Sequence, residues 1–220
     1  MFLYQLFTSF EMPLALFVFL AYFFALLIAL SAHEFAHGFA AYREGDMTAK
    51  AYGRLTLNPF KHVDIIGMIF LILVGFGWSK PVPINPTVFK NGKKSAINVC
   101  LSGVLTNLAL AIIFSFLFVL TSMLDPSVSF FVFLHQFCYY SVMINFVFFV
   151  FNLLPIYPLD GFNFLCLFLK PTNKFLEFMF KYGFIVLLLL YITNIFGLIL
   201  NLLMSLIINP LTQLWILILF

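Results

Sequence analysis

The stretch from Leu14 to Tyr42 is almost wholly apolar, and this tract constrains the fold more than any other feature. A helix over these residues is long enough to cross the roughly 30 Å hydrocarbon core of a bilayer. Over the whole chain 64% of residues are hydrophobic and 9% are charged, whereas soluble domains carry about 45–50% apolar and about 25% charged residues. The sequence therefore predicts an integral membrane protein.

Four to six hydrophobic segments are expected along the 220 residues. The tracts run from about Pro13 to Tyr42, Ile65 to Gly77, Ala96 to Met123, Phe130 to Leu169, and Tyr182 to Phe220. The predicted fold class is an all-α polytopic membrane protein, a helical bundle of about 4–6 transmembrane segments with a short re-entrant or extended element. The last tract is expected to form either one span with a surface tail or a hairpin.

The second tract is too short to span the bilayer. Its 13 residues make a helix of roughly 20 Å, and three of them are glycines. Basic residues mark the cytoplasmic side, and they follow the first, second and fourth tracts. If the second tract dips in and returns, every basic loop lies on one side. The sequence therefore favours a re-entrant element.

His33, Glu34 and His37 form an H-E-x-x-H cluster inside the first apolar tract. Residues four apart share one face of a helix, so both imidazoles can bind one metal ion while the glutamate reaches its water as general base. Ionisable groups at membrane depth are costly, which argues for a functional reason. The alternative is a chance match to a loose pattern.

Catalytic zinc usually takes a third protein ligand, and Asp160 is the candidate. It lies in the irregular run Asn152–Gly161, in which two prolines break the helix. His33 lies ten residues before Arg43 and Asp160 ten residues before Lys170, so both lie within about 15 Å of the cytoplasmic interface. The alternative for Asp160 is a helix cap or a turn.

Other polar residues in apolar tracts have two possible roles each. Asn152 could position the substrate carbonyl, or its amide could bond a backbone carbonyl freed near Pro155. Asn107 is expected to serve interhelical packing, and neither His62 nor His135 has a partner at metal spacing. Residues 75–86 could be an extended edge that pairs with substrate, or an interfacial loop.

Two further expectations concern the cysteines and the first residues of the chain. Cys100, Cys138 and Cys166 are scattered without C-x-x-C spacing, which predicts small buried side chains and no disulfide framework. Residues 1–12 have no Lys or Arg, so they lack the positive region of a cleavable signal peptide.

Taken together, four motifs between about Ser31 and Gly161 resemble the site-2 protease family of intramembrane zinc metalloproteases. The motifs are His33–His37, Gly53–His62, Trp78–Pro83 and Asn152–Gly161. The resemblance implies that His33, His37 and Asp160 bind one catalytic Zn²⁺, that Glu34 is the catalytic base, and that Asn152 handles substrate. One departure is Gly103-Val104, where relatives often carry Gly-Pro.

We therefore expect an intramembrane zinc metalloendopeptidase that cleaves in or near transmembrane segments of other membrane proteins. Residues 1–220 would form one peptidase domain, with a catalytic core at about 12–169 and further hydrophobic segments at 182–220. Its surroundings would be the lipid bilayer of a bacterial cell membrane, with the site toward the cytoplasm and no nucleic-acid partner. The alternatives are a divalent-metal transporter, which would spread ligands along a path, and a non-catalytic membrane scaffold.

Overall fold

The computed structural model of the chain describes residues 12–74 and 77–220, which are helical with no strand among them. This confirms the all-α prediction. The elements are α2 (Met12–Arg43), α3 (Thr48–Ala51), η1 (Pro59–Lys61), α4 (Ile65–Val74), η2 (Pro86–Val88), α5 (Lys93–Thr121), α6 (Ser129–Asn152), α7 (Asp160–Cys166), α8 (Lys174–Ile192), α9 (Ile195–Leu203), η3 (Met204–Ile208) and α10 (Asn209–Leu219).

Five helical stretches in the described residues are long and apolar enough to cross a membrane, within the predicted range of four to six. They are Leu14–Arg43, Lys93–Thr121, Ser129–Asn152, Lys174–Ile192 and Ile195–Leu219. The fourth apolar tract, Phe130 to Leu169, is interrupted as its sequence predicts, because its long helix ends at Asn152. The reason is Pro155 and Pro158, which cannot continue a helix.

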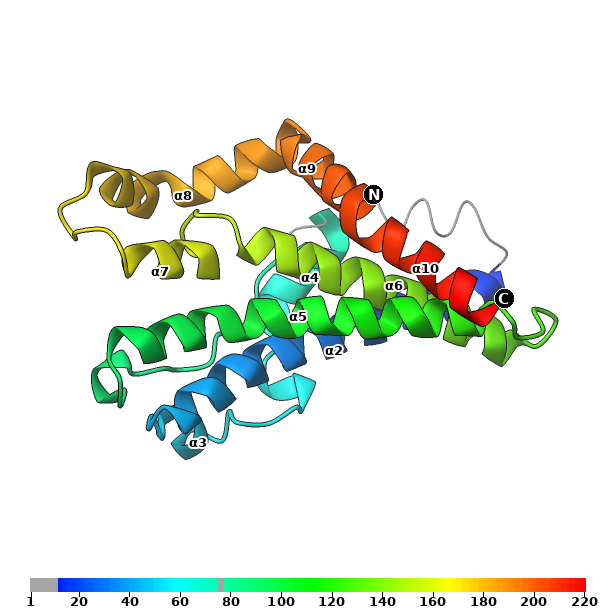
Figure 1. The fold of residues 1–220 in the computed structure, drawn as a ribbon, viewed down its shortest axis with the longest axis horizontal. Helices are drawn as coiled ribbons and strands as arrows, with labels where there is room; N and C mark the ends of the chain where they lie inside the picture. Colours follow the sequence, from blue (N-terminus) through cyan, green and yellow to red (C-terminus); the bar gives the residue numbers. More distant parts are fainter. Residues whose placement is uncertain (1–11, 75–76) are drawn as a thin grey trace.

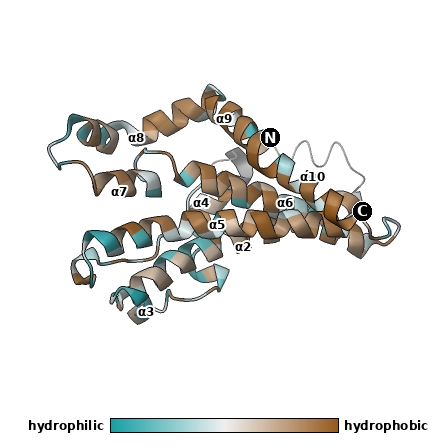
Figure 2. Ribbon diagram, viewed as in Figure 1, coloured by the Kyte–Doolittle hydropathy of each residue, from teal (hydrophilic) through white to brown (hydrophobic). Residues whose placement is uncertain are grey.

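Helices α2, α5 and α6 pack side by side as the centre of the bundle (Figure 1). Small residues of α2, Ala25 and Ala29, are fully buried against Ile144 of α6, and this lets the helix backbones approach closely. Most residues of the long helices are hydrophobic, as the brown ribbons in Figure 2 show. Lipid-facing apolar surface is what a bilayer requires.

Helix α4 does not span, as the re-entrant prediction requires. It has ten residues, or about 15 Å, and it runs across the long helices in Figure 1 rather than along them. After it, residues 77–85 have no helix, and we call them the strap. The strap makes one isolated antiparallel bridge, between Val63 and Ser79, and no strand. Residues 75 and 76 of the expected extended segment lie outside the described residues.

The basic loops lie at one end of the bundle. The loops after α2, before α5 and between α7 and α8 are at the left in Figure 1, opposite the α5–α6 loop. Hydrophilic residues gather at that same left end in Figure 2. The short α4 therefore lets every basic loop share one side, which is the pattern that the charge distribution predicts.

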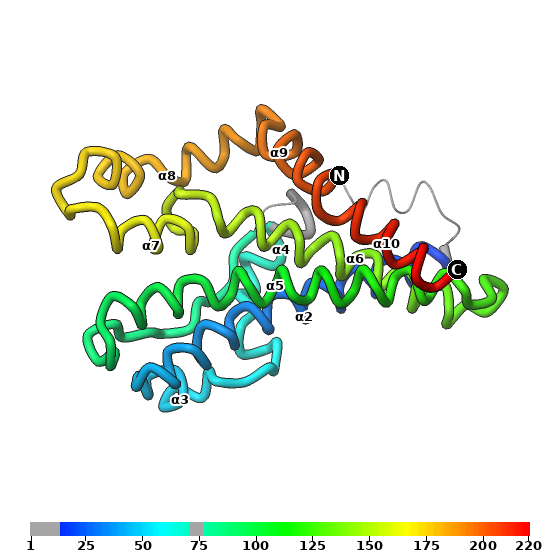
Figure 3. The backbone as a smooth tube through the Cα atoms, viewed as in Figure 1, coloured from blue at the N-terminus to red at the C-terminus, as the bar shows by residue number. Residues whose placement is uncertain are grey.

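The C-terminal tract does not fold back as a hairpin, which was one of its two expected arrangements (Figure 3). Helix α8 is followed at Asn194, whose φ is 57°, by α9, η3 and α10. The tube in Figure 3 shows α8 and then α9–α10 advancing in the same direction along the bundle, joined by a bend, rather than folding back as a hairpin. Helix α10 returns to the core, where Trp215 Nε1 donates to Ser115 Oγ of α5 at 2.9 Å.

Candidate active site

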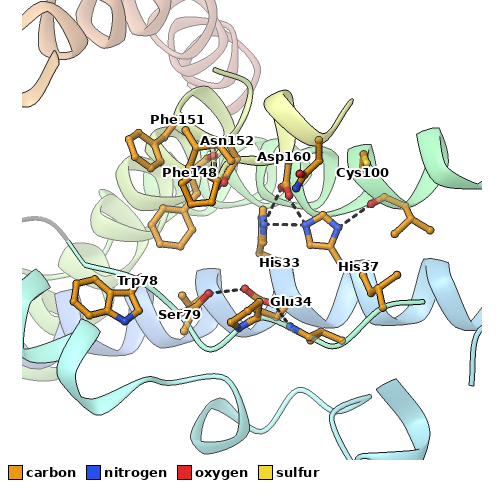
Figure 4. A pocket seen from close by; sticks show the side chains of 18 of the residues that line it. His33, Glu34, His37, Trp78, Ser79, Cys100, Phe148, Phe151, Asn152 and Asp160 are labelled. Carbon is orange, nitrogen blue, oxygen red and sulfur yellow. Dashed lines mark hydrogen bonds and ion pairs between the residues drawn. The ribbon is translucent and has the colours of Figure 1, made fainter. Parts of the chain in front are cut away.

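The last turns of α2 place the H-E-x-x-H side chains inside the bundle. His33, Glu34 and His37 are all buried, with 7–8% of each exposed. The two imidazoles point toward α5, and Glu34 points toward the strap (Figure 4). The helix separates these directions because the histidines are four residues apart and Glu34 follows the first of them directly.

Asp160 meets the histidines because the chain turns sharply after α6. Residues 153–159 are irregular, and Asp160 opens α7, which packs against α5. Gly161 permits this turn, since a Cβ there would lie 2.6 Å from Leu154 O. Asp160 Oδ2 lies 3.2 Å from His33 Nε2 and 3.1 Å from His37 Nε2.

The second ring nitrogen of each histidine fixes which atom faces this cluster. His37 Nδ1 lies 2.8 Å from Val99 O, and His33 Nδ1 lies 2.6 Å from Asn107 Oδ1. Both partners are acceptors, so both Nδ1 atoms carry the proton and both Nε2 atoms present a lone pair. The two Nε2 atoms are 3.0 Å apart.

Three acceptor atoms therefore converge with no hydrogen atom to share between them. Such a cluster is repulsive unless a cation lies among the atoms. Two imidazoles and a carboxylate are a usual zinc donor set, and ligand atoms around a tetrahedral zinc ion lie roughly 3.4 Å apart. The observed separations of 3.0–3.2 Å are close to this spacing. The residues fit Zn²⁺.

A relay of amides orients His33. Asn107 Nδ2 donates to Asn145 Oδ1 at 2.9 Å and to Ala29 O at 3.2 Å, which leaves Asn107 Oδ1 for the imidazole. Asn145 Nδ2 donates in turn to Ser141 O at 2.8 Å, so a backbone carbonyl sets the direction of the whole relay. Interhelical bonding was expected for Asn107 from the sequence, but its contact with His33 and the part played by Asn145 were not. Both are asparagines in apolar tracts, which is the available signal.

Gly103 of α5 gives the imidazoles room. A Cβ at this position would lie 2.7 Å from His33 Cε1 and 2.8 Å from His33 Nε2, and closer still to His37 Nε2. Real contacts between carbon atoms are about 3.5–4.0 Å. The helix can approach the two histidines because this residue has no side chain.

Glu34 is held from the opposite side by the strap. Ser79 Oγ donates to Glu34 Oε1 at 2.6 Å, and the Val82 N–H donates to Oε2 at 2.9 Å. Each carboxylate oxygen thus has one donor from the strap. Neither contact was expected from sequence, because both depend on where the segment after α4 returns.

A cavity of about 980 Å³ opens beside these residues. Its lining includes the strap, aromatic residues of α6 and α8, and the site residues His33, Glu34, His37 and Asp160. Asn152 lines it too, and its Nδ2 donates to Phe148 O at 3.1 Å, a helical carbonyl one turn back. The structure thus places Asn152 on the cavity wall without testing its role.

The remaining histidines lie apart from this group. His62 is fully buried in the loop after η1, where Nε2 lies 2.7 Å from Thr56 O. His135 Nδ1 lies 3.0 Å from Thr121 Oγ1 near the other end of the bundle. Within residues 12–74 and 77–220, His33, His37 and Asp160 are the one group found that could hold a metal ion. A ligand path such as a transporter needs is not seen in that part.

All three cysteines are free thiols, and the expected burial holds for one of them. Cys138 is buried, while Cys100 and Cys166 are half-buried and line the cavity.

Comparison with known proteins found relatives with informative names. The chain is 40% identical over 184 residues to "Putative zinc metalloprotease YwhC" of Bacillus subtilis, covering 82% of this chain and 83% of that protein. It is 32% identical over 173 residues to "Putative zinc metalloprotease Rip2" of Mycolicibacterium smegmatis, with 76% and 64% covered, and 32% identical over 158 residues to the Mycobacterium tuberculosis protein of that name, with 67% and 57% covered. No protein-family model and no solved structure matches the chain.

Proposed function

We propose, from the premise that this chain belongs to the zinc metalloprotease family of YwhC and Rip2, that it is an intramembrane endopeptidase of the site-2 protease class. The relatives confirm the predicted enzyme class and its Zn²⁺ cofactor. The observation that carries the proposal is the convergence of His33, His37 and Asp160 beside Glu34, in a cavity among helices long enough to span a bilayer.

His33, His37 and Asp160 would hold the zinc ion through the two Nε2 atoms and a carboxylate oxygen. Zinc held there supplies a Lewis acid and lowers the pKa of water into the neutral range. Asn107 and Val99 keep each imidazole in the tautomer that ligation requires. These residues therefore prepare the site.

Glu34 would move the protons. As general base it takes a proton from the attacking water at a carboxylate oxygen, and it then gives that proton to the leaving amine nitrogen. Each oxygen has two lone pairs, so the contacts with Ser79 and Val82 leave accepting capacity.

The proposed substrate is a transmembrane segment of another membrane protein. The peptide bonds of a helix are shielded, so the segment must be unwound near the site before attack. The cavity, of about 980 Å³, has room for several side chains, and Phe148, Phe151 and Phe184 on its wall suit apolar ones. Asn152, on the same wall, would hold a substrate carbonyl.

The proposed orientation places this site toward the cytoplasm of a bacterial cell. The basic loops lie at the end of the bundle that holds α7 and the last turn of α2. Positive loops mark the cytoplasmic side. The relatives are bacterial proteins, which supports the choice of membrane.

Glu34→Gln tests the proposal in liposomes that contain a membrane-embedded substrate. We expect cleavage to be lost while zinc per protein, measured by elemental analysis, stays at the wild-type level. Glu177→Gln, an exposed acid on α8, is the matched control and should cleave normally. Full cleavage by Glu34→Gln would refute the role of this base.

A further inference from the structure

The loop from Gly53 to His62 buries two polar residues that the proposed chemistry does not use. Arg54 is 8% exposed and His62 is fully buried. Neither lines the cavity or belongs to the metal group. This loop is one of the four sequence motifs, and its contacts lie on the side of α2 that holds Glu34.

Arg54 is a buried cation with an unusual set of partners. Its Nη2 donates to Lys80 O at 2.5 Å and to Pro81 O at 3.2 Å, two successive carbonyls of the strap. Among the described residues no carboxylate lies within ion-pair distance of it. Burying a guanidinium is costly, and here two carbonyl dipoles are the compensation. The loop is therefore joined to the strap by the hydrogen bonds of Arg54.

Three further contacts fix the strap along its length. The Lys80 N–H donates to His62 O at 2.8 Å, and Ser79 bridges to Val63. Farther on, the Asn85 N–H donates to Asp46 Oδ2 at 2.7 Å. Lys80 and Pro81, which Arg54 holds, lie directly between Ser79 and Val82. The hydrogen bonds from Arg54 thus reach the strap between the two residues that contact Glu34.

The Glu34 carboxylate receives both of its strap contacts from this fixed stretch. Ser79 Oγ is 2.6 Å from Oε1 and Val82 N is 2.9 Å from Oε2. Hydrogen bonds to a charged group are short, strong and directional. A donor on each oxygen sets the plane of the carboxylate and removes its rotational freedom.

We propose that Ser79 and Arg54 are positioning residues for the general base: Ser79 orients the Glu34 carboxylate directly, and Arg54 does so by holding the strap. The inference rests on the proposed function, in which Glu34 transfers the protons. A correctly placed base matters for the chemical step and much less for substrate binding. Loss of either contact should therefore lower kcat and leave KM nearly unchanged.

The test compares Ser79→Ala, Ser79→Thr and Arg54→Lys with the wild type in the liposome assay. We expect Ser79→Ala to lower kcat about tenfold, since a hydrogen bond to a charge is lost, with KM within about twofold. Ser79→Thr keeps the hydroxyl and should restore kcat. Arg54→Lys keeps the charge but loses the planar fork, so kcat should also fall.

Coupling and matched controls separate positioning from general damage. Both residues act on one carboxylate, so their effects should not multiply. The fold loss of kcat in the double variant should therefore be smaller than the product of the fold losses in the two single variants. Zinc content and thermal midpoint should stay at wild-type values in Ser79→Ala. Ser205→Ala and Arg43→Lys, at exposed positions, should leave kcat unchanged.

Two results would overturn the inference while leaving the proposed function intact. One is wild-type kcat in Ser79→Ala when Glu34→Gln is inactive. The other is a higher kcat in Ser79→Ala, because the strap would then restrain the base. Full cleavage by Glu34→Gln would instead remove the proposed function itself. If Arg54→Lys fails to fold, the comparison of Ser79→Ala with Ser79→Thr tests the inference by itself.

Discussion

Replacing Gly103 with alanine should damage the metal site through sterics alone. The added methyl group would lie 2.7 Å from His33 Cε1 and 2.8 Å from His33 Nε2, and nearer to His37 Nε2. Relief to about 3.5 Å needs a movement of roughly 0.7 Å or more. Zinc ligands tolerate deviations of about 0.2 Å, so the imidazoles cannot accommodate the methyl group and keep their geometry.

Moving α5 away from α2 would relieve the steric clash only at the cost of other contacts. The same helix supplies Val99 O to His37 and Asn107 Oδ1 to His33, and a retreat would stretch both hydrogen bonds. We expect zinc affinity, measured by competition with a chromophoric chelator, to fall by about 10–100-fold, the usual cost of disturbing groups that orient ligands. Cleavage should fall in parallel at limiting zinc.

The control enlarges a residue on the lipid-facing side of the same helix. Ala109 is exposed, so Ala109→Val should retain zinc and activity. Wild-type zinc affinity and full cleavage in Gly103→Ala would refute the steric reasoning. A drop in zinc affinity in both variants would instead indicate a general loss of helix packing.

Two other predictions follow from the ligand cluster and its relay. Asn107→Leu removes the acceptor for His33 Nδ1, so zinc affinity should fall about 10–100-fold; Asn209→Leu, an asparagine outside the site, is its control in the chelator competition. Because three acceptors repel one another without a cation, added zinc should raise the thermal midpoint of the wild type, and a chelator should reverse this and abolish cleavage. Asp160→Ala should lose most of this zinc-dependent shift, and an unchanged shift would remove Asp160 from the donor set.

Local sequence patterns predicted the parts of this site that depend on one helix or one turn. The spacing of His33 and His37 places both on one helix face, and the prolines after Asn152 end α6 as expected. The basic residues that follow each tract predicted that Asp160 and His33 lie at a similar depth in the membrane. The structure places the three side chains together.

Contacts that depend on packing between distant segments could not be predicted. Ser79 reaches Glu34 because α4 crosses the bundle (Figure 1) and the strap that follows it returns to contact α2, a path that no periodicity encodes. Asn107 finds His33 only through the register of α5 on α2. The bend at Asn194 likewise depends on one positive φ value, so its direction could not be predicted from the sequence.

The amide relay across α6, α5 and α2 also limits how the protein can move. Sliding α6 by one residue past α5 would carry Asn145 away from Asn107 and leave the imidazole tautomer of His33 undefined. The alignment of the three helices and the orientation of a metal ligand therefore depend on the same hydrogen bonds. We expect any opening for substrate to come from the elements around these helices, because a shift between them would break the relay.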